Sequence, residues 1–354
     1  MEPTESPARI GEVDVVDTTT GAMRRWIAAI DDTDALDRYA AEVAATAGAL
    51  VRGGADAIAT CRAVTGLHDA LVARLIELAQ AELGPPPCPY AWLALGSGGR
   101  MEQSLHTDQD HAVVYADGEE AAAPYFASLG ERLVDGLARA GLRRCPGGYM
   151  ADRWHLSLPS WRDLFRGWVQ RPEPQALVEA EVFLDFRRIH GELSLEPLAA
   201  VLRQGAGAPR FLVGMARAAV RFPPPLRLVG PVRPRSGEVD LKRAGLAAVV
   251  LLARLYGLAA GSVVRSTPDR LAVAASAGVL GRRAASDLAD AHGLLSELRL
   301  AAQLRQVAAD QAPTNRVPLA DLTADERGRL RQGLGAIRDA QRLTALRYRT
   351  DIVL

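Results

Sequence analysis

Residues 90–115 constrain the fold of this chain more than any other stretch. The apolar run at residues 90–95 predicts a buried strand, and the glycines that follow it break the strand. We expect residues 100–105 to form a short helix and residues 110–115 to form a second strand. Apolar side chains recur every three or four positions over residues 121–140, which predicts an amphipathic helix. This order of elements predicts a small mixed α/β domain.

Two acidic residues, Asp108 and Asp110, lie at the start of the second predicted strand. Side chains two positions apart on an extended chain point to the same face, so we expect the two carboxylates to lie together. The break at Gly96 and Ser97 offers backbone N–H groups and a helix N-terminus, which suit phosphate oxygens. Carboxylates beside phosphates are the environment that Mg²⁺ prefers. The pattern therefore predicts a site for Mg²⁺ and a nucleoside triphosphate.

The longer string around this break resembles a known family. Gly96-Ser97-Gly98-Gly99-Arg100-Met101-Glu102-Gln103, followed by Thr107-Asp108-Gln109-Asp110, is similar to bacterial nucleotidyltransferases related to the N-terminal part of protein-PII uridylyltransferase. These proteins are a branch of the polymerase-β-type nucleotidyltransferase superfamily. Segments of the C-terminal half resemble the substrate-binding helical domain of the same family, and they are residues 240–243, 266–271, 299–303 and Asn315.

The resemblance covers nearly the whole chain from about residue 30 and implies an α+β fold. A small mixed-sheet, polymerase-β-like core would be flanked by N-terminal helices and by a C-terminal helical bundle. The expected organisation is a flexible tail, an N-terminal helical region, a nucleotidyltransferase domain and a helical substrate-binding domain. These parts are expected at residues 1–20, 21–84, 85–192 and 193–354, respectively.

The resemblance also implies an activity: Mg²⁺-dependent transfer of a nucleoside monophosphate to an acceptor hydroxyl, on a protein, with release of pyrophosphate. Two Mg²⁺ ions would be held by three carboxylates, those of Asp108, Asp110 and Asp185. Other residues would hold or orient the nucleotide. They are Gly96, Ser97, Arg100, Lys242, Arg243 and Arg270 for binding, and Glu102 as the partner that orients Arg100.

Asp185 is the member of this set that the sequence leaves most open. It lies in an apolar run between two phenylalanines, and a buried carboxylate is costly unless it is paired or bound to a metal. We favour the metal-binding role, in which Asp185 completes the site or acts as a general base. The alternative is an ion pair with Arg187 or Arg188.

Composition limits the classes of partner. The chain has 354 residues with 42 basic and 42 acidic side chains, so its formal net charge is zero. Nucleic-acid and membrane-surface binders usually show a basic excess, and we therefore expect neither partner. An acidic N-terminus without an apolar segment, and three scattered cysteines, favour a cytoplasmic protein.

Two other functions stay open at this point. The first is a nucleotide-binding regulatory protein with little turnover, because the chain lacks the regulatory domains that follow the transferase in uridylyltransferases. The second, weaker one is a transferase that acts on RNA ends or on small molecules. For His68 and Asp69 we expect a helix-surface pair or a local hydrogen bond, and for Trp154, Trp161 and Trp168 a place in the core.

Overall fold

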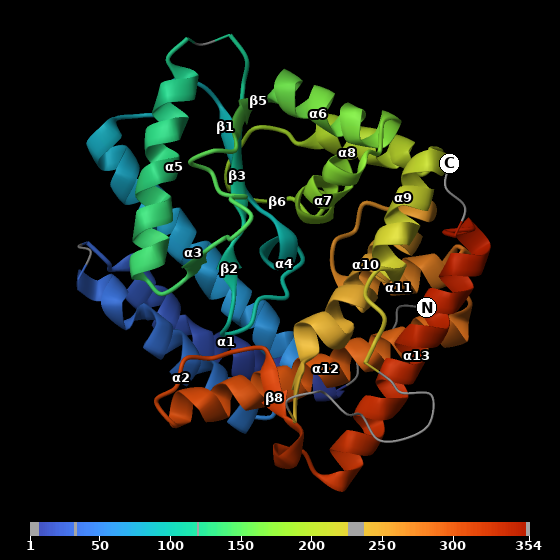
Figure 1. Cartoon of the computed structure of the whole chain (residues 1–354). Helices are drawn as coiled ribbons and strands as arrows, with labels where there is room; N and C mark the ends of the chain where they lie inside the picture. Colours follow the sequence, from blue (N-terminus) through green and yellow to red (C-terminus); the bar gives the residue numbers. More distant parts are fainter. Residues whose placement is uncertain (1–6, 32–33, 119, 226–236, 352–354) are drawn as a thin grey trace. The chain divides into compact units, whose positions relative to one another are not determined.

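The computed structural model describes residues 7–31, 34–118, 120–225 and 237–351 (Figure 1). These residues form two compact units. The first contains the chain up to Leu158 together with residues 187–193 and 304–313, and the second contains residues 159–186, 194–303 and 314–354. Neither unit matches the expected domain ranges: residues 159–186 group with the C-terminal helices, and the N-terminal helices group with the sheet.

A four-stranded mixed sheet forms the centre of the first unit. Its order is β5-β3-β1-β6, in which β1 is antiparallel to both β3 and β6, and β5 is parallel to β3. All five residues of β1 are buried, as the apolar run predicts. The strands are β1 (Tyr90–Ala94), β3 (His111–Tyr115), β5 (His155–Ser157) and β6 (Arg187–Gly191). The sheet and the many helices confirm the α+β fold class.

The sheet is covered by helices that come before β1 in the sequence and by one that follows β3. They are α1 (Pro7–Ala28), α2 (Tyr39–Arg52), α3 (Ala57–Leu83) and α5 (Ala122–Arg139), with a 3₁₀ turn at Asp34–Arg38. The Asp56 side chain caps α3 by accepting a hydrogen bond from the Ala59 N–H. Apolar side chains of α3 and α5 share one core with Trp92 and Val113 of the sheet. The amphipathic helix predicted over residues 121–140 is α5.

The expectation of a loose tail over residues 1–20 is corrected by α1, which begins at Pro7. Residues 1–6 lie outside the described part of the chain. Val16, Thr20, Met23 and Ile27 follow one another at intervals of three or four, which places them on one side of a helix. Met23 and Ile27 are buried in the core shared with α3, so tertiary packing stabilises this helix.

The short helix after β1 also lies elsewhere than predicted. We expected it at residues 100–105, but α4 spans Gly96–Gly99 and begins in the glycine-rich turn itself. Met101 has a positive φ of 62°, which ends the helix, and a loop then leads to β2 (Asp108–Gln109). A parallel partner for β2 is supplied by β4 (Arg143–Arg144).

The second unit is a helical bundle, as predicted for the C-terminal half. Its helices are α6 (Leu158–Gln170), α7 (Pro174–Phe183), α8 (Glu196–Gly205), α9 (Pro209–Val220), a π-helical turn (Lys242–Leu246), α10 (Ala247–Ala259), α11 (Thr267–Ser276), α12 (Arg282–Ala308), a 3₁₀ turn (Leu319–Asp321) and α13 (Ala324–Tyr348). The final residues of α12, from Leu304, belong to the first unit. A two-stranded antiparallel ribbon joins β7 (Glu238–Asp240) to β8 (Arg316–Pro318).

Buried aromatic side chains occupy the start of this unit. Trp161 and Trp168 lie in α6 and contact Phe165 and Phe183, which confirms the core role expected for these two tryptophans. Trp154 belongs to the first unit and is half-buried, and its indole N–H donates to the Gly148 carbonyl. Within the described ranges, the chain contains no helix both long and apolar enough to span a membrane.

Candidate functional site

The glycine-serine turn and the aspartate pair come together in the first unit. Gly96 has a φ of 49°, a conformation that glycine adopts without strain. The Leu95 N–H donates to the Asp110 carbonyl over 2.9 Å, which ties the end of β1 to the start of β3. A Cβ built on Gly96 would lie 3.0 Å from Asp110 Oδ2. The turn therefore lies directly against the Asp110 carboxylate, with no room for a side chain between them.

The carboxylates of Asp108 and Asp110 both contact the same neighbouring segment of the chain. Asp108 Oδ1 accepts a hydrogen bond from Arg143 over 2.6 Å, and the Asp110 carboxylate accepts one from the Cys145 thiol. Arg143 and Cys145 are themselves two positions apart on the neighbouring segment. Gln109 points the other way and is buried, where its amide donates to two backbone carbonyls.

The partners of the two carboxylates differ in charge and in exposure. Arg143, the partner of Asp108, is a cation with a side chain that is 55% exposed, whereas Cys145, the partner of Asp110, is an uncharged thiol that is half-buried. The side chain of Asp108 itself is only 17% exposed. Burial, followed by the charge of Asp110 and the hydrogen bond to it, raises the pKa of Cys145 to about 11. The thiol therefore stays protonated at neutral pH. Arg143 can swing into solvent and leave the Asp108 carboxylate to another cation.

Arg100 and Glu102 form a largely buried ion pair just after the turn. Arg100 Nε lies 2.7 Å from Glu102 Oε2. The positive φ of Met101 between them turns the backbone so that the two side chains meet at a spacing of two residues. This is the contact by which Glu102 would orient Arg100. A charge-assisted bond of this kind holds the guanidinium in one position.

A second arginine, which we did not predict from the sequence, binds the backbone of the glycine-rich turn. Arg187, at the start of β6, donates to the Gly98 carbonyl over 2.9 Å, and its guanidinium also pairs with Asp69 of α3. Asp69 and Arg187 are 118 residues apart in sequence, so no local pattern connects them. Asp69 therefore does not form the helix-surface pair or local hydrogen bond that we expected, but links α3 to β6 and to the glycine-rich helix over a long sequence distance.

The loop that carries the aspartates is fixed to α3 in the same way. The Gln103 N–H donates to Thr65 Oγ1 over 3.0 Å, and the Gln103 amide donates to Thr107 Oγ1 over 3.2 Å. All three residues are buried. Thr107 immediately precedes Asp108, so this chain of hydrogen bonds sets where the first carboxylate lies.

Asp185 has a different environment from the one expected at a metal site. It is 0% exposed, and its carboxylate binds Arg254, at 2.5 Å, and Arg270, at 2.7 Å. It also precedes β6 instead of lying on a strand. Asp185 is in an ion pair, but not with Arg187 or Arg188 as the alternative supposed: its partners are Arg254 of α10 and Arg270 of α11. We therefore leave Asp185 out of the metal site.

The remaining predicted cations lie in the second unit and fall into two kinds. Arg270, expected to bind the nucleotide, is buried against Asp185. Lys242 and Arg243 are exposed at the π-helical turn, a type of irregularity that often marks functional sites. Lys242 is also the only lysine in the chain, where every other basic residue is an arginine.

The donor set limits what metal the site could hold. Within the residues that the structure describes, no cluster of three or more His, Cys, Asp or Glu side chains is arranged to hold a metal ion. Two carboxylates are nevertheless what Mg²⁺ commonly takes from a protein when substrate phosphates and water complete its shell. Asp108 and Asp110, against a turn that a Cβ would fill, fit this mode of binding.

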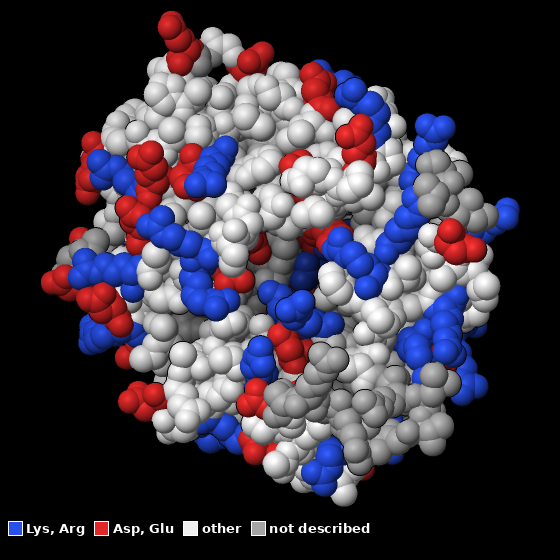
Figure 2. Space-filling model, viewed as in Figure 1, with Lys and Arg blue, Asp and Glu red and all other residues white. Residues whose placement is uncertain are grey.

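Figure 2 shows the distribution of charge on one face of the molecule. Basic and acidic side chains are interspersed over the face in view, in keeping with the equal numbers of both signs.

Comparison with known families covers both halves of the chain. Residues 41–175 match the family model described as "Putative nucleotidyltransferase DUF294", and residues 209–348 match its companion, a nucleotidyltransferase substrate-binding domain. The first match contains Gly96, Ser97, Asp108 and Asp110, and the second contains Lys242 and Arg243. The comparison with curated proteins found no match. The resemblance seen in the sequence motifs is confirmed: the chain belongs to the DUF294 family of nucleotidyltransferases and carries that family's substrate-binding domain.

Proposed function

We propose that this protein moves a nucleoside monophosphate from a nucleoside triphosphate to an acceptor hydroxyl and releases pyrophosphate. The acceptor hydroxyl gives its proton to water as its oxygen bonds to the α-phosphorus, and the bond from that phosphorus to the oxygen shared with the β-phosphate breaks, so that pyrophosphate leaves. The observation that carries the proposal is the contact between the Gly96 turn and the Asp110 carboxylate, with Asp108 two positions away along the chain. A phosphate-binding turn beside two carboxylates is what this reaction requires.

Asp108 and Asp110 would hold Mg²⁺, and the resemblance implies two ions. When bound, Mg²⁺ neutralises the charge that develops on the phosphate oxygens and on the leaving pyrophosphate. The exposed Arg143 would move from Asp108 to make room for the ion. Both carboxylates are held by the backbone tie at Leu95 and by the Thr107 hydrogen bond, so they need little rearrangement.

The triphosphate would lie on the first turn of α4. Backbone N–H groups in the first turn of a helix have no partner within the helix, and those near Gly96 and Ser97 would donate to phosphate oxygens. Arg100, held by Glu102, would add a fixed positive charge. Two residues of the second unit, Lys242 and Arg243, are also proposed to bind the nucleotide, because they are exposed cations within the part of the chain that matches the substrate-binding domain. We do not propose nucleotide binding for Arg270, because its charge is paired with that of Asp185.

The acceptor that we propose is a hydroxyl on a protein, and this part rests on the resemblance to uridylyltransferases of protein PII. The experiment is incubation with Mg²⁺, labelled ATP or UTP and a cell lysate, with label transfer and pyrophosphate release as readouts. We expect transfer by the native chain. Asp108→Asn combined with Asp110→Asn should abolish it, because the carboxylates supply most of the charge that holds the metal.

Asp117→Asn is the matched control, since Asp117 is an exposed aspartate in the turn after β3. It should leave transfer unchanged. Unchanged transfer in the double variant would show that the site is assigned wrongly. Tight nucleotide binding with no pyrophosphate release, with any acceptor fraction, would favour the alternative of a nucleotide-binding regulatory protein.

A further inference from the structure

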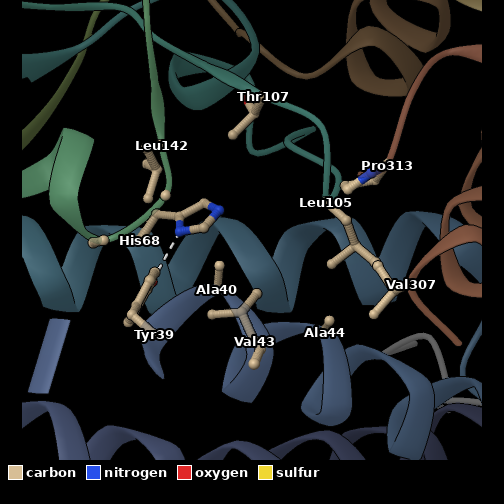
Figure 3. Close-up of a pocket in the computed structure, with 13 residues that line it drawn as sticks. Tyr39, Ala40, Val43, Ala44, His68, Leu105, Thr107, Leu142, Val307 and Pro313 are labelled. Carbon is tan, nitrogen blue, oxygen red and sulfur yellow. Dashed lines mark hydrogen bonds between the residues drawn. The ribbon is translucent and has the colours of Figure 1, made fainter. Parts of the chain in front are cut away.

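A cavity of about 220 Å³ lies in the first unit, between α2, α3 and the loop that leads to β2 (Figure 3). Most of the side chains around it are aliphatic, and two of its lining residues, Ala40 and Ala41, are exposed. Its lining includes Tyr39, Ala44, His68, Leu105, Thr107 and Leu142.

His68 places one unpaired nitrogen at the wall of this cavity. Its side chain is 93% buried, with 7% exposed, and Nδ1 is 2.8 Å from the Tyr39 hydroxyl. Nε2 is buried and has no hydrogen-bond partner among the described residues. Figure 3 shows the imidazole directed into the open space between Leu142 and Leu105. A buried polar atom without a partner costs stability, so the site favours a ligand that supplies one.

The walls of the cavity carry no charge. None of its described lining residues is Lys, Arg, Asp or Glu. Burial lowers the pKa of His68 to about 4, so the imidazole is neutral near pH 7. Burial also raises the pKa of Tyr39 well above its usual value, so its hydroxyl stays protonated. A charged ligand would lose its hydration here without gaining a counter-charge.

Water is a poor occupant of such a space, because a buried water usually needs two to four polar partners. Besides His68 Nε2, the lining side chain that could bind such a water is that of Thr107. Its hydroxyl already forms hydrogen bonds with the Gln103 amide and the Asp108 carbonyl. An apolar cavity of about 150 Å³ is large enough for benzene. The space here therefore accommodates one ring with a small substituent.

We infer that this cavity binds a neutral small molecule that has a single apolar ring and one hydroxyl group, with the hydroxyl bonded to His68 Nε2. A hydroxyl both donates and accepts, so it can pair with Nε2 in either neutral form of the imidazole. The ring would contact the aliphatic walls formed by Ala44, Leu105 and Leu142.

The position of the cavity connects it to the aspartate pair. Thr107 immediately precedes Asp108, and Leu142 immediately precedes Arg143, the ion-pair partner of Asp108. A ligand in the cavity therefore contacts both segments that hold this ion pair. We expect such a ligand to change turnover, and this expectation rests on the proposed function. Binding of the ligand, and ordering of the loop that leads to β2, do not depend on the proposed function.

Phenol is the probe for the test, with benzene and benzoate as comparators. Calorimetry should show saturable binding of one phenol per chain. Benzene lacks the hydroxyl and should bind about tenfold more weakly, and benzoate should not bind. With ¹⁵N-labelled histidine, phenol should shift the His68 Nε2 resonance. Hydrogen exchange of the amides at residues 104–110 should slow when phenol is bound.

Two variants add atoms to lining residues of the cavity. Ala44→Leu adds atoms at a buried lining position, and Ala40→Leu adds the same atoms at an exposed lining position. Each should weaken phenol binding at least tenfold. Ala123→Leu adds the same side chain to an exposed position of α5 and should bind phenol like the native chain. The inference is overturned if phenol does not bind, if both cavity variants bind it as well as the control does, or if benzoate binds equally.

Discussion

Asp185→Asn separates a structural role of this residue from a catalytic one. In the native chain both carboxylate oxygens bind arginine: Oδ1 contacts Arg254 Nε at 3.2 Å and Arg270 Nη2 at 2.7 Å, and Oδ2 contacts Arg254 Nη2 at 2.5 Å. All three side chains are buried. The substitution keeps the shape of the side chain but removes its charge, and it leaves two guanidinium groups in the core of the second unit.

The expected cost follows from this burial. Removal of one partner from a buried ion pair destabilises a protein by about 3–5 kcal/mol, because the remaining charge stays desolvated without compensation. Burial raises the pKa of Glu181, and the nearby charge of Arg254 opposes that rise. Because Arg254 keeps this second acidic neighbour, we expect the lower part of that range. For a unit of this size, each 1 kcal/mol shifts the melting temperature by roughly 2–4 °C. The transition of the second unit should therefore fall by on the order of 10 °C.

Hydrogen exchange measured along α10 and α11 assigns the loss to the second unit, and urea unfolding gives its size. The two arginines lie on these helices, so their amides should lose protection first. Asp163→Asn is the matched control. Asp163 lies in α6 of the same unit and pairs with Arg166, but its side chain is 68% exposed. Its loss should cost less than about 1 kcal/mol.

The catalytic role predicts the opposite pair of results. If Asp185→Asn unfolds at the same urea concentration as the native chain but no longer transfers nucleotide, the carboxylate acts on the metal or the acceptor. The ion-pair argument would then be refuted. If the variant is destabilised and yet transfers nucleotide at the native rate per folded molecule, the exclusion of Asp185 from the metal site stands.

Two further predictions concern the first unit. Arg187→Met removes the bond to the Gly98 carbonyl and should lower kcat for nucleotidyl transfer about tenfold or more, whereas Arg188→Met, at the exposed neighbouring position, should have no effect on kcat. Burial lowers the pKa of His68 to about 4 and that of His111 to about 3, from 6.5. Below pH 6.5 the unfolded chain therefore binds protons that the folded chain does not bind. The contribution of the two histidines to the free energy of unfolding is complete above pH 6.5 and is lost as the pH falls towards their folded-state pKa values. Urea unfolding at about pH 7.5 and about pH 5 should differ by about 2 kcal/mol for each histidine, and equal stability at both pH values would contradict this burial effect.

Short-range patterns predicted the parts of the site that are close in sequence. The buried run of β1, the break at Gly96 and the alternation of Asp108 and Asp110 are each set by a few neighbouring residues. Their physical basis is local, namely period-two alternation of side chains and the freedom of glycine at positive φ. The position of α4 was missed because glycine has poor helix propensity, and here tertiary contacts outweigh it.

Contacts between distant segments could not be predicted from the sequence alone. Arg187 reaches Asp69 across 118 residues, and Arg254 reaches Asp185 across 69. Most basic residues of the chain are arginines, so nothing in the sequence marks which of them pairs with a given carboxylate. The apolar surroundings of Asp185 correctly indicated a compensated buried charge, but the same pattern fits a metal and an arginine equally well.

The exposure of three arginine–carboxylate contacts decides which acidic residue can exchange its partner for a metal. Asp185 is fully buried between two arginines, and opening that cluster would strand charges in the core. Asp69 is largely buried with Arg187, and separating them would also release the glycine-rich helix. The contact of Asp108 differs because more than half of the Arg143 side chain is in solvent, so breaking it costs at most about 1 kcal/mol. Under the proposed function, binding of Mg²⁺ through the substrate phosphates would more than offset that cost, and Asp108 is then the one of these three carboxylates that could exchange its arginine for the metal.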